Sequence, residues 1–108
     1  MLNKNERTME AYMEAGAYAR LLSDIGAKAV VSISKILPVK DADRLAVLLN
    51  KIEEIICKAD DQLFRDFPGI GNKGADVFYG TLSAQPRNKL DEKVVQMAQQ
   101  KTGELFEN

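Results

Sequence analysis

The sequence predicts an all-α protein, a single compact bundle of four to five helices built from residues 1–108. Three observations support this. Apolar residues recur at three- and four-residue steps in several segments, which is the spacing of one helix face. Only 3 residues are proline, and one β-branched run has no second strand-like segment to pair with. With 45% hydrophobic and 29% charged residues, the chain should fold, and its 108 residues are enough for one core but too few for two.

The first predicted helix follows Thr8, whose hydroxyl can cap it, and continues to about Asp24. We expect the polar residues 1–7 before it to be frayed. One stripe of this helix is apolar and contains Met9, Met13, Ala17 and Leu21. The small residues 15–17 and Ala19 predict a packing surface on which another helix can approach closely.

Gly26 interrupts the pattern, and residues 27–37 fit either a helix or a strand. We favour a helix, because a lone strand would lack a partner. Pro38 ends this element, since proline removes a backbone donor and restricts the residue before it.

The strongest helix is predicted from about Ala42 to Asp66, with Asp41 or Asp43 as its cap. Cys57 falls beside its apolar stripe and is interpreted as a small apolar side chain. The stripe contains Leu45, Leu48, Leu49, Ile52, Ile55, Ile56, Ala59 and Leu63.

Two shorter helices are predicted after this. Lys73 or Gly74 opens the first, which reaches about Leu82, and Asn88 caps the second. The apolar face of the last helix contains Leu90, Val94, Met97, Ala98 and Leu105.

Composition excludes several function classes. The 15 Lys and Arg residues against 16 Asp and Glu give a net charge of −1, so the whole chain does not attract nucleic acid or anionic lipid. With one cysteine and no histidine, we expect no zinc-type metal site, no cofactor and no catalytic activity. No apolar run approaches the ~20 residues of a membrane span, so we expect a cytoplasmic protein without membrane association.

The segment from Phe64 to Tyr79 contains a proline, three glycines and a lysine between two apolar-periodic stretches. Glycines permit close approach of a ligand to the backbone, and the start of a helix presents free N–H groups to anions. The predicted phosphate-binding residues are Gly69, Gly71, Lys73 and Gly74. Phe67 and Ile70 are the predicted apolar anchors of the loop. The alternative is a purely structural turn, in which glycine ends one helix before the next begins.

Residues 63–82 resemble the helix-hairpin-helix motif of DNA-binding and DNA-repair proteins. The residues that carry the likeness are Phe67, Pro68, Gly69, Ile70, Gly71, Lys73 and Ala75. The resemblance implies that backbone N–H groups near Gly69 and Gly71 face a DNA phosphate, that Lys73 adds charge, and that Ile70 packs between the helices. Such contacts read no base sequence. Residues 65–93 contain five basic and four acidic residues, so the local charge is also small.

Two functions follow as expectations. In the first, the chain is a small non-catalytic binding or regulatory protein that acts as a homo-oligomer and binds a protein partner through a helix face. In the second, the loop Pro68–Ala75 binds DNA backbone non-specifically, or a phosphate-bearing small ligand such as a nucleotide.

Overall fold

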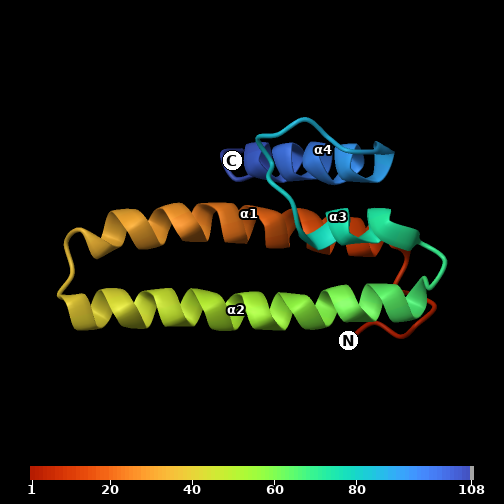
Figure 1. Ribbon diagram of the computed structural model, residues 1–108. Coiled ribbons are helices and arrows are strands. Elements are labelled where there is room, and N and C mark those ends of the chain that lie inside the picture. The colour runs from red at the N-terminus through yellow and green to blue at the C-terminus, as the bar shows by residue number, and fades with distance from the viewer. Residues whose placement is uncertain (108) are drawn as a thin grey trace.

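Two long helices lie side by side and form the body of the molecule (Figure 1). In the computed structural model, which describes residues 1–107, α1 spans Met9–Ser34 and α2 spans Val39–Asp66. A 3₁₀ turn at Gly71–Gly74 leads into the short helix α3, Ala75–Phe78, and α4 spans Lys89–Glu104. All regular structure in the described chain is helical, which confirms the all-α class.

The predicted interruption at Gly26 is wrong, because α1 continues through it to Ser34. A β-carbon on Gly26 would lie 2.7 Å from the Cδ1 atom of Leu49, so glycine here lets α2 approach α1 closely. The helical interpretation of residues 27–37 is therefore confirmed as far as Ser34. Thr8 caps α1 as predicted, since its hydroxyl accepts the N–H of Ala11 at 3.1 Å.

The start of α2 differs from the prediction. Pro38 occupies the cap position, and its carbonyl accepts the N–H groups of Asp41 and Ala42, both at 3.0 Å. Neither Asp41 nor Asp43 caps the helix, because both lie inside it, Asp41 in its first turn. The end at Asp66 is as predicted, and the N–H of Phe67 closes it on the carbonyl of Leu63 at 2.8 Å.

The short helix α3 ends at Phe78 rather than near Leu82. Gly80 has a φ of +114°, a conformation that favours glycine, and it turns the chain away from the helix. Asn88 caps α4 as predicted, with its side chain accepting the N–H of Asp91 at 2.8 Å. Leu105 lies beyond α4 and is 78% exposed, so its predicted place on the packed face is wrong.

The core lies at one end of the helix pair, where α3 and α4 cover α1. Tyr12 is central to it, with edge-to-face contacts to Phe67 and Phe78 at ring distances of 6.0 and 6.4 Å. Two clusters make up the core: Tyr12, Ala19, Leu63, Ile70, Val77 and Phe78 in one, and Ala17, Val94 and Ala98 in the other. Of the predicted small-residue surface of α1, Gly16, Ala17 and Ala19 are buried and pack within the same chain, whereas Ala15 is exposed.

Arg20 fastens the α3–α4 connection to α1. Its guanidinium is 1% exposed and donates to the carbonyls of Asp76, Gly80 and Thr81 at 2.9, 3.1 and 3.0 Å. It also donates to the carboxylate of Asp91 at 2.7 Å. Because these partners lie before, within and after an irregular segment, one side chain holds that segment in place.

The other end of the helix pair is uncovered. Figure 1 shows that α3 and α4 lie over one half of the pair and leave the half around the α1–α2 connection without a covering layer. We call residues 22–55 the arm. The predicted apolar stripe of α2 passes through the arm. The one buried residue of α2, Leu63, lies outside the arm.

Candidate functional site

The glycine-containing loop begins directly after α2 and is anchored in the core. Ile70 is 9% exposed and belongs to the main core cluster, while Phe67 packs against that cluster. The N–H of Ile70 donates to the carbonyl of Phe67 at 3.1 Å, which closes the turn. Gly71 then takes a φ of +72°, where a side chain would be strained. The two predicted anchors, Phe67 and Ile70, therefore both contact the core.

The glycines of the loop have different surroundings. A β-carbon on Gly69 or Gly71 would meet no atom within 4 Å, so the backbone there is open to a ligand. Gly74 is buried, and a β-carbon on it would lie 2.8 to 3.0 Å from side-chain atoms of Ile70 and Phe64. Gly74 therefore permits close packing of the loop and does not face the surface.

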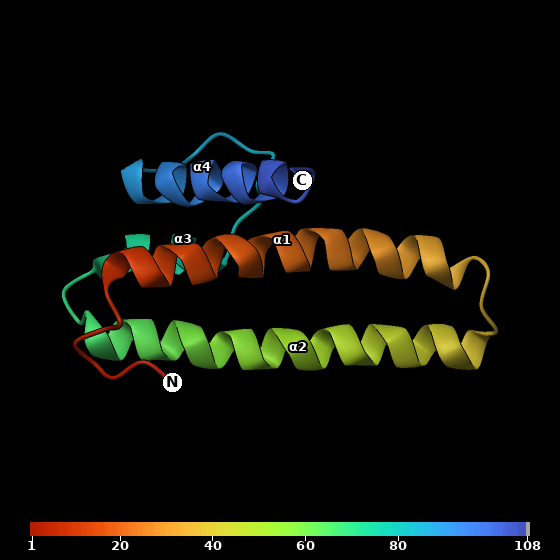
Figure 2. The same cartoon turned by 180° about the vertical axis from the view of Figure 1, so that it is seen from behind.

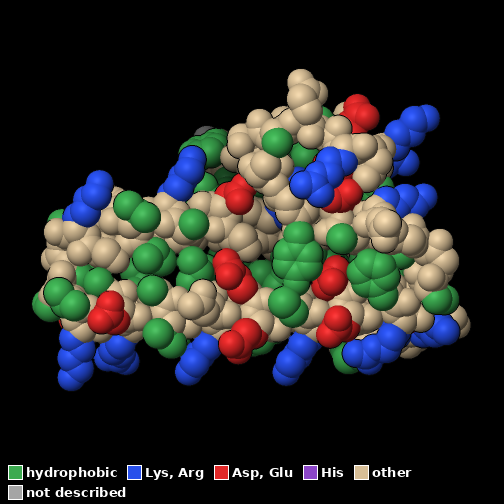
Figure 3. All heavy atoms as spheres, viewed as in Figure 1, with side chains coloured by type: hydrophobic (Ala, Val, Ile, Leu, Met, Phe, Trp, Pro, Cys, Tyr) green, Lys and Arg blue, Asp and Glu red, His purple; other side chains and the backbone are tan. Residues whose placement is uncertain are grey.

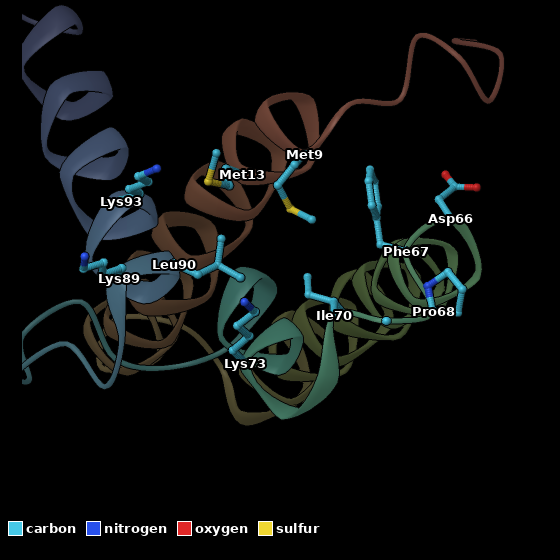
Figure 4. Close-up of a pocket in the computed structure, with 11 residues that line it drawn as sticks. Met9, Met13, Asp66, Phe67, Pro68, Ile70, Lys73, Lys89, Leu90 and Lys93 are labelled. Carbon is cyan, nitrogen blue, oxygen red and sulfur yellow. The ribbon is translucent and has the colours of Figure 1, made fainter.

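A cavity of about 630 Å³ lies between the loop, the start of α1 and the start of α4 (Figure 4). Of the predicted phosphate-binding residues, the cavity includes Gly69 and Lys73. Its lining is Met9, Met13, Asp66, Phe67, Pro68, Gly69, Ile70, Lys73, Lys89, Leu90 and Lys93. Most of these side chains are apolar, and three are lysines.

The three lysines give the lining of the cavity a positive charge. Lys73, Lys89 and Lys93 are exposed, and none forms an ion pair within residues 1–107. Lys89 and Lys93 lie four residues apart and so share one face of α4. In the sequence, Lys89 and Lys93 stand out only as two of the basic residues in a segment of mixed charge. Their four-residue spacing indicates that they share a helix face, but it does not indicate that the loop lies opposite that face.

Asp66 is the one acidic residue of the lining, and it is directed away from the cavity (Figure 4). Its carboxylate accepts hydrogen bonds from Arg7, at 2.7 and 3.2 Å, and from the hydroxyl of Tyr12. The Arg7 hydrogen bond, followed by that of Tyr12, holds the pKa of Asp66 well below its ordinary value. The charge of Asp66 is thus engaged by Arg7, which also ties the N-terminal segment to the end of α2.

A second surface is an apolar stripe on the long helices. On α1 its exposed members follow one another at three-, four- and eight-residue steps, and on α2 they follow at four- and three-residue steps. We call this set the stripe: Tyr18, Leu22, Ile25 and Ile33 on α1, Ile36 just beyond its end, and Leu48, Ile52 and Ile55 on α2. Each is between 39% and 83% exposed.

The stripe faces away from α3. A helix turns by about 100° per residue, so the direction of each side chain follows from its distance to Gly26 or Leu49, which face each other across the pair. By this measure the stripe residues of both helices lie on the same side. Gly16 and Arg20, which contact the α3 segment, lie on the other side. Figure 2 views the helix pair from the stripe side, with α3 behind α1.

The opposite face has a different character (Figure 3). Charged side chains of both signs line the outer edge of α2 there, and hydrophobic side chains show in the furrow between α1 and α2.

Cys57 is exposed rather than packed, and its sulfur accepts a hydrogen bond from the Tyr79 hydroxyl at 2.9 Å. Burial, and then this hydrogen bond, raise the pKa of Tyr79. The small apolar role predicted for Cys57 is therefore wrong.

No family model matches the chain, and no curated protein or solved structure matches it at a significant level. Within residues 1–107, none of the helices has the length and apolar character needed to cross a membrane.

Proposed function

We propose that this chain is a non-catalytic interaction protein that self-associates through the stripe on α1 and α2. The observation that carries the proposal is that two antiparallel helices expose apolar side chains, at close to heptad spacing, on one common face. Large apolar patches on a folded domain usually mark an interaction surface.

A second copy is a natural occupant of this face. Two helix pairs that meet through their stripes form a four-helix arrangement, in which the spacing lets side chains from each pair interlock. Such a contact is isologous, because the same residues are used by both copies. The small-residue surface of α1 is already occupied within the chain, so the stripe is the surface left for association.

The size of the face is consistent with a dimer. At 1.5 Å per residue, the stripe runs for about 22 Å on α1, from Tyr18 to Ile33, and for about 10 Å on α2, from Leu48 to Ile55, and each helix is ~10 Å wide. Its footprint of about 330 Å² can supply the apolar centre of the ~800 Å² that each partner buries in a standard interface.

Sedimentation equilibrium over a range of protein concentrations tests the proposal. We expect wild type to dimerise, and Ile25→Lys or Ile55→Lys to shift it to monomer. Val31→Lys and Val47→Lys are matched controls, since both residues are exposed but lie outside the stripe. A wild-type monomer at high micromolar concentration would contradict self-association, as would equal effects of stripe and control variants.

A second candidate function is anion binding at the loop, either to DNA backbone or to a phosphate-bearing small ligand such as a nucleotide. It is supported by the open backbone at Gly69 and by three lysines that form no ion pair within residues 1–107, all of them in the lining of one cavity. Contacts with about two or three phosphates give a salt slope of roughly −2 to −3 for duplex DNA. Fluorescence anisotropy with a short duplex, comparing wild type with Lys73→Glu, measures this slope. No binding at low salt would remove DNA as the ligand.

A further inference from the structure

We propose that the cavity between the loop, α1 and α4 binds a small amphiphilic anion, a molecule with an apolar chain and a carboxylate or phosphate head group. This inference names the ligand class for the anion site of the second candidate function and rests on that site. It is independent of self-association, because the stripe and the cavity share no residue.

The apolar part of the cavity comes from three separate segments. Met9 and Met13 of α1 lie on one side, Phe67 and Ile70 of the loop on another, and Leu90 of α4 on a third (Figure 4). A volume of about 630 Å³ is within the usual range for small-molecule sites. Methionine side chains are flexible and polarizable, so they adapt to chains of different shape.

The head group is expected at the lysines. Lys89 and Lys93 extend from one face of α4, with the Lys89 nitrogen directed outward, and Lys73 extends from the 3₁₀ turn at Gly71–Gly74 toward Leu90 (Figure 4). Their ammonium groups can each donate a charge-assisted hydrogen bond to a carboxylate or phosphate oxygen. Asp66 does not oppose the anion, because Arg7 and Tyr12 already hold its carboxylate.

A bare anion would use only part of the site. The lysines are exposed, and contacts between exposed charges contribute little on their own. Among residues 1–107, no arginine lines the cavity to bind phosphate with two parallel hydrogen bonds. Further binding free energy can come from burial of the apolar lining. A free phosphate or a DNA phosphate does not cover this lining, which stays in contact with water. The combination therefore favours a ligand that supplies both parts.

Isothermal titration calorimetry with decyl phosphate and decanoate, both below the concentration at which they form micelles, tests the inference. We expect saturable binding at one site per chain. Each methylene added from octyl to decyl phosphate should tighten binding by about two- to fourfold, because about 0.8 kcal/mol accompanies each buried methylene. Inorganic phosphate and decanol, which supply only one part each, should bind at least tenfold more weakly. Equal binding of decanol and decyl phosphate would overturn the role of the lysines.

Variants locate the site. Lys89→Gln/Lys93→Gln should weaken decyl phosphate binding at least tenfold, while Lys51→Gln/Lys58→Gln, which removes two exposed charges from α2, should leave it unchanged. Circular dichroism confirms matched helicity. Equal losses in both double variants would overturn the assignment to this cavity. DNA binding that Lys73→Glu abolishes, without decyl phosphate binding, would overturn the inference but keep the second candidate function. Absence of both would overturn both.

Discussion

The guanidinium of Arg20 and the carboxylate of Asp91 meet at 2.7 Å although 71 residues separate them in the sequence, and both side chains are buried. Asp91 also accepts the N–H of Arg87 at 2.9 Å. Burial opposes ionisation of Asp91, but the hydrogen bonds from Arg87 and Arg20 outweigh it and lower its pKa. The pair joins α1 to α4 across the irregular segment that follows α3.

Removing one member of this pair should be costly. We expect Arg20→Met to lower the free energy of unfolding by about 3–5 kcal/mol, because Asp91 is left buried without its partner and three backbone carbonyls lose a donor. Urea denaturation measures the change. Arg65→Met, at an exposed position, is the control and should change stability by no more than about 0.5 kcal/mol. Similar losses in both variants would show that the Arg20 contacts are not the cause.

Stability should fall in acid. The pKa of Asp66 is lowered from its ordinary value of 3.8, chiefly by the Arg7 hydrogen bond, so the unfolded chain takes up the proton first as pH decreases. The stabilisation is complete well above pH 3.8 and is lost as pH falls through this value toward the folded-state pKa. The lowered pKa of Asp91 adds a change of the same sign.

Asp66→Asn separates these contributions. The variant should be less stable than wild type at neutral pH, and the difference should shrink as pH falls below 3.8, because protonation removes the same charge from wild type. Urea denaturation at a series of pH values measures both curves. Parallel curves would mean that Asp66 does not contribute to the acid sensitivity.

Local patterns in the sequence were sufficient for the helices and their polar caps. Thr8 and Asn88 cap helices as predicted, because a cap depends only on residues within one turn. Gly26 was misinterpreted since its role depends on Leu49, which the chain brings beside it only after folding. The end of α3 was also missed, because Gly80 acts through a backbone conformation that composition does not specify.

The candidate site was predictable only in part. The loop and its anchors Phe67 and Ile70 follow from a contiguous segment, and the structure places both anchors against the core. The cavity depends on α4 lying opposite the loop, which joins Lys89 and Lys93 to Lys73. The apolar periodicity of α2 correctly predicted a helix but not which half of it would be covered, because both halves carry the same pattern.

Self-association predicts a dependence of thermal stability on concentration. If folded copies dimerise through the stripe, mass action favours the folded state as protein concentration increases, so Tm should rise. Differential scanning calorimetry over a hundredfold range of concentration measures this. Ile55→Lys should remove the dependence and Val47→Lys should retain it, because only Ile55 belongs to the stripe. A Tm that stays constant in wild type would contradict the dimer.

Two glycines that lie within helices should respond to alanine in opposite ways. A β-carbon on Gly16 would overlap the carbonyl oxygen of Val77 and lie 2.8 Å from its carbonyl carbon, and this backbone cannot yield without displacing α3. Overpacking typically costs about 1–3 kcal/mol, and alanine contributes up to ~1 kcal/mol in a helix, so Gly16→Ala should destabilise the protein by a net amount of up to about 2 kcal/mol. Gly103 has no atom within 4 Å of the same position, so Gly103→Ala should stabilise by up to ~1 kcal/mol. Urea denaturation of both variants distinguishes packing from propensity: if Gly16→Ala were also stabilising, the close contact between α1 and Val77 would be disproved.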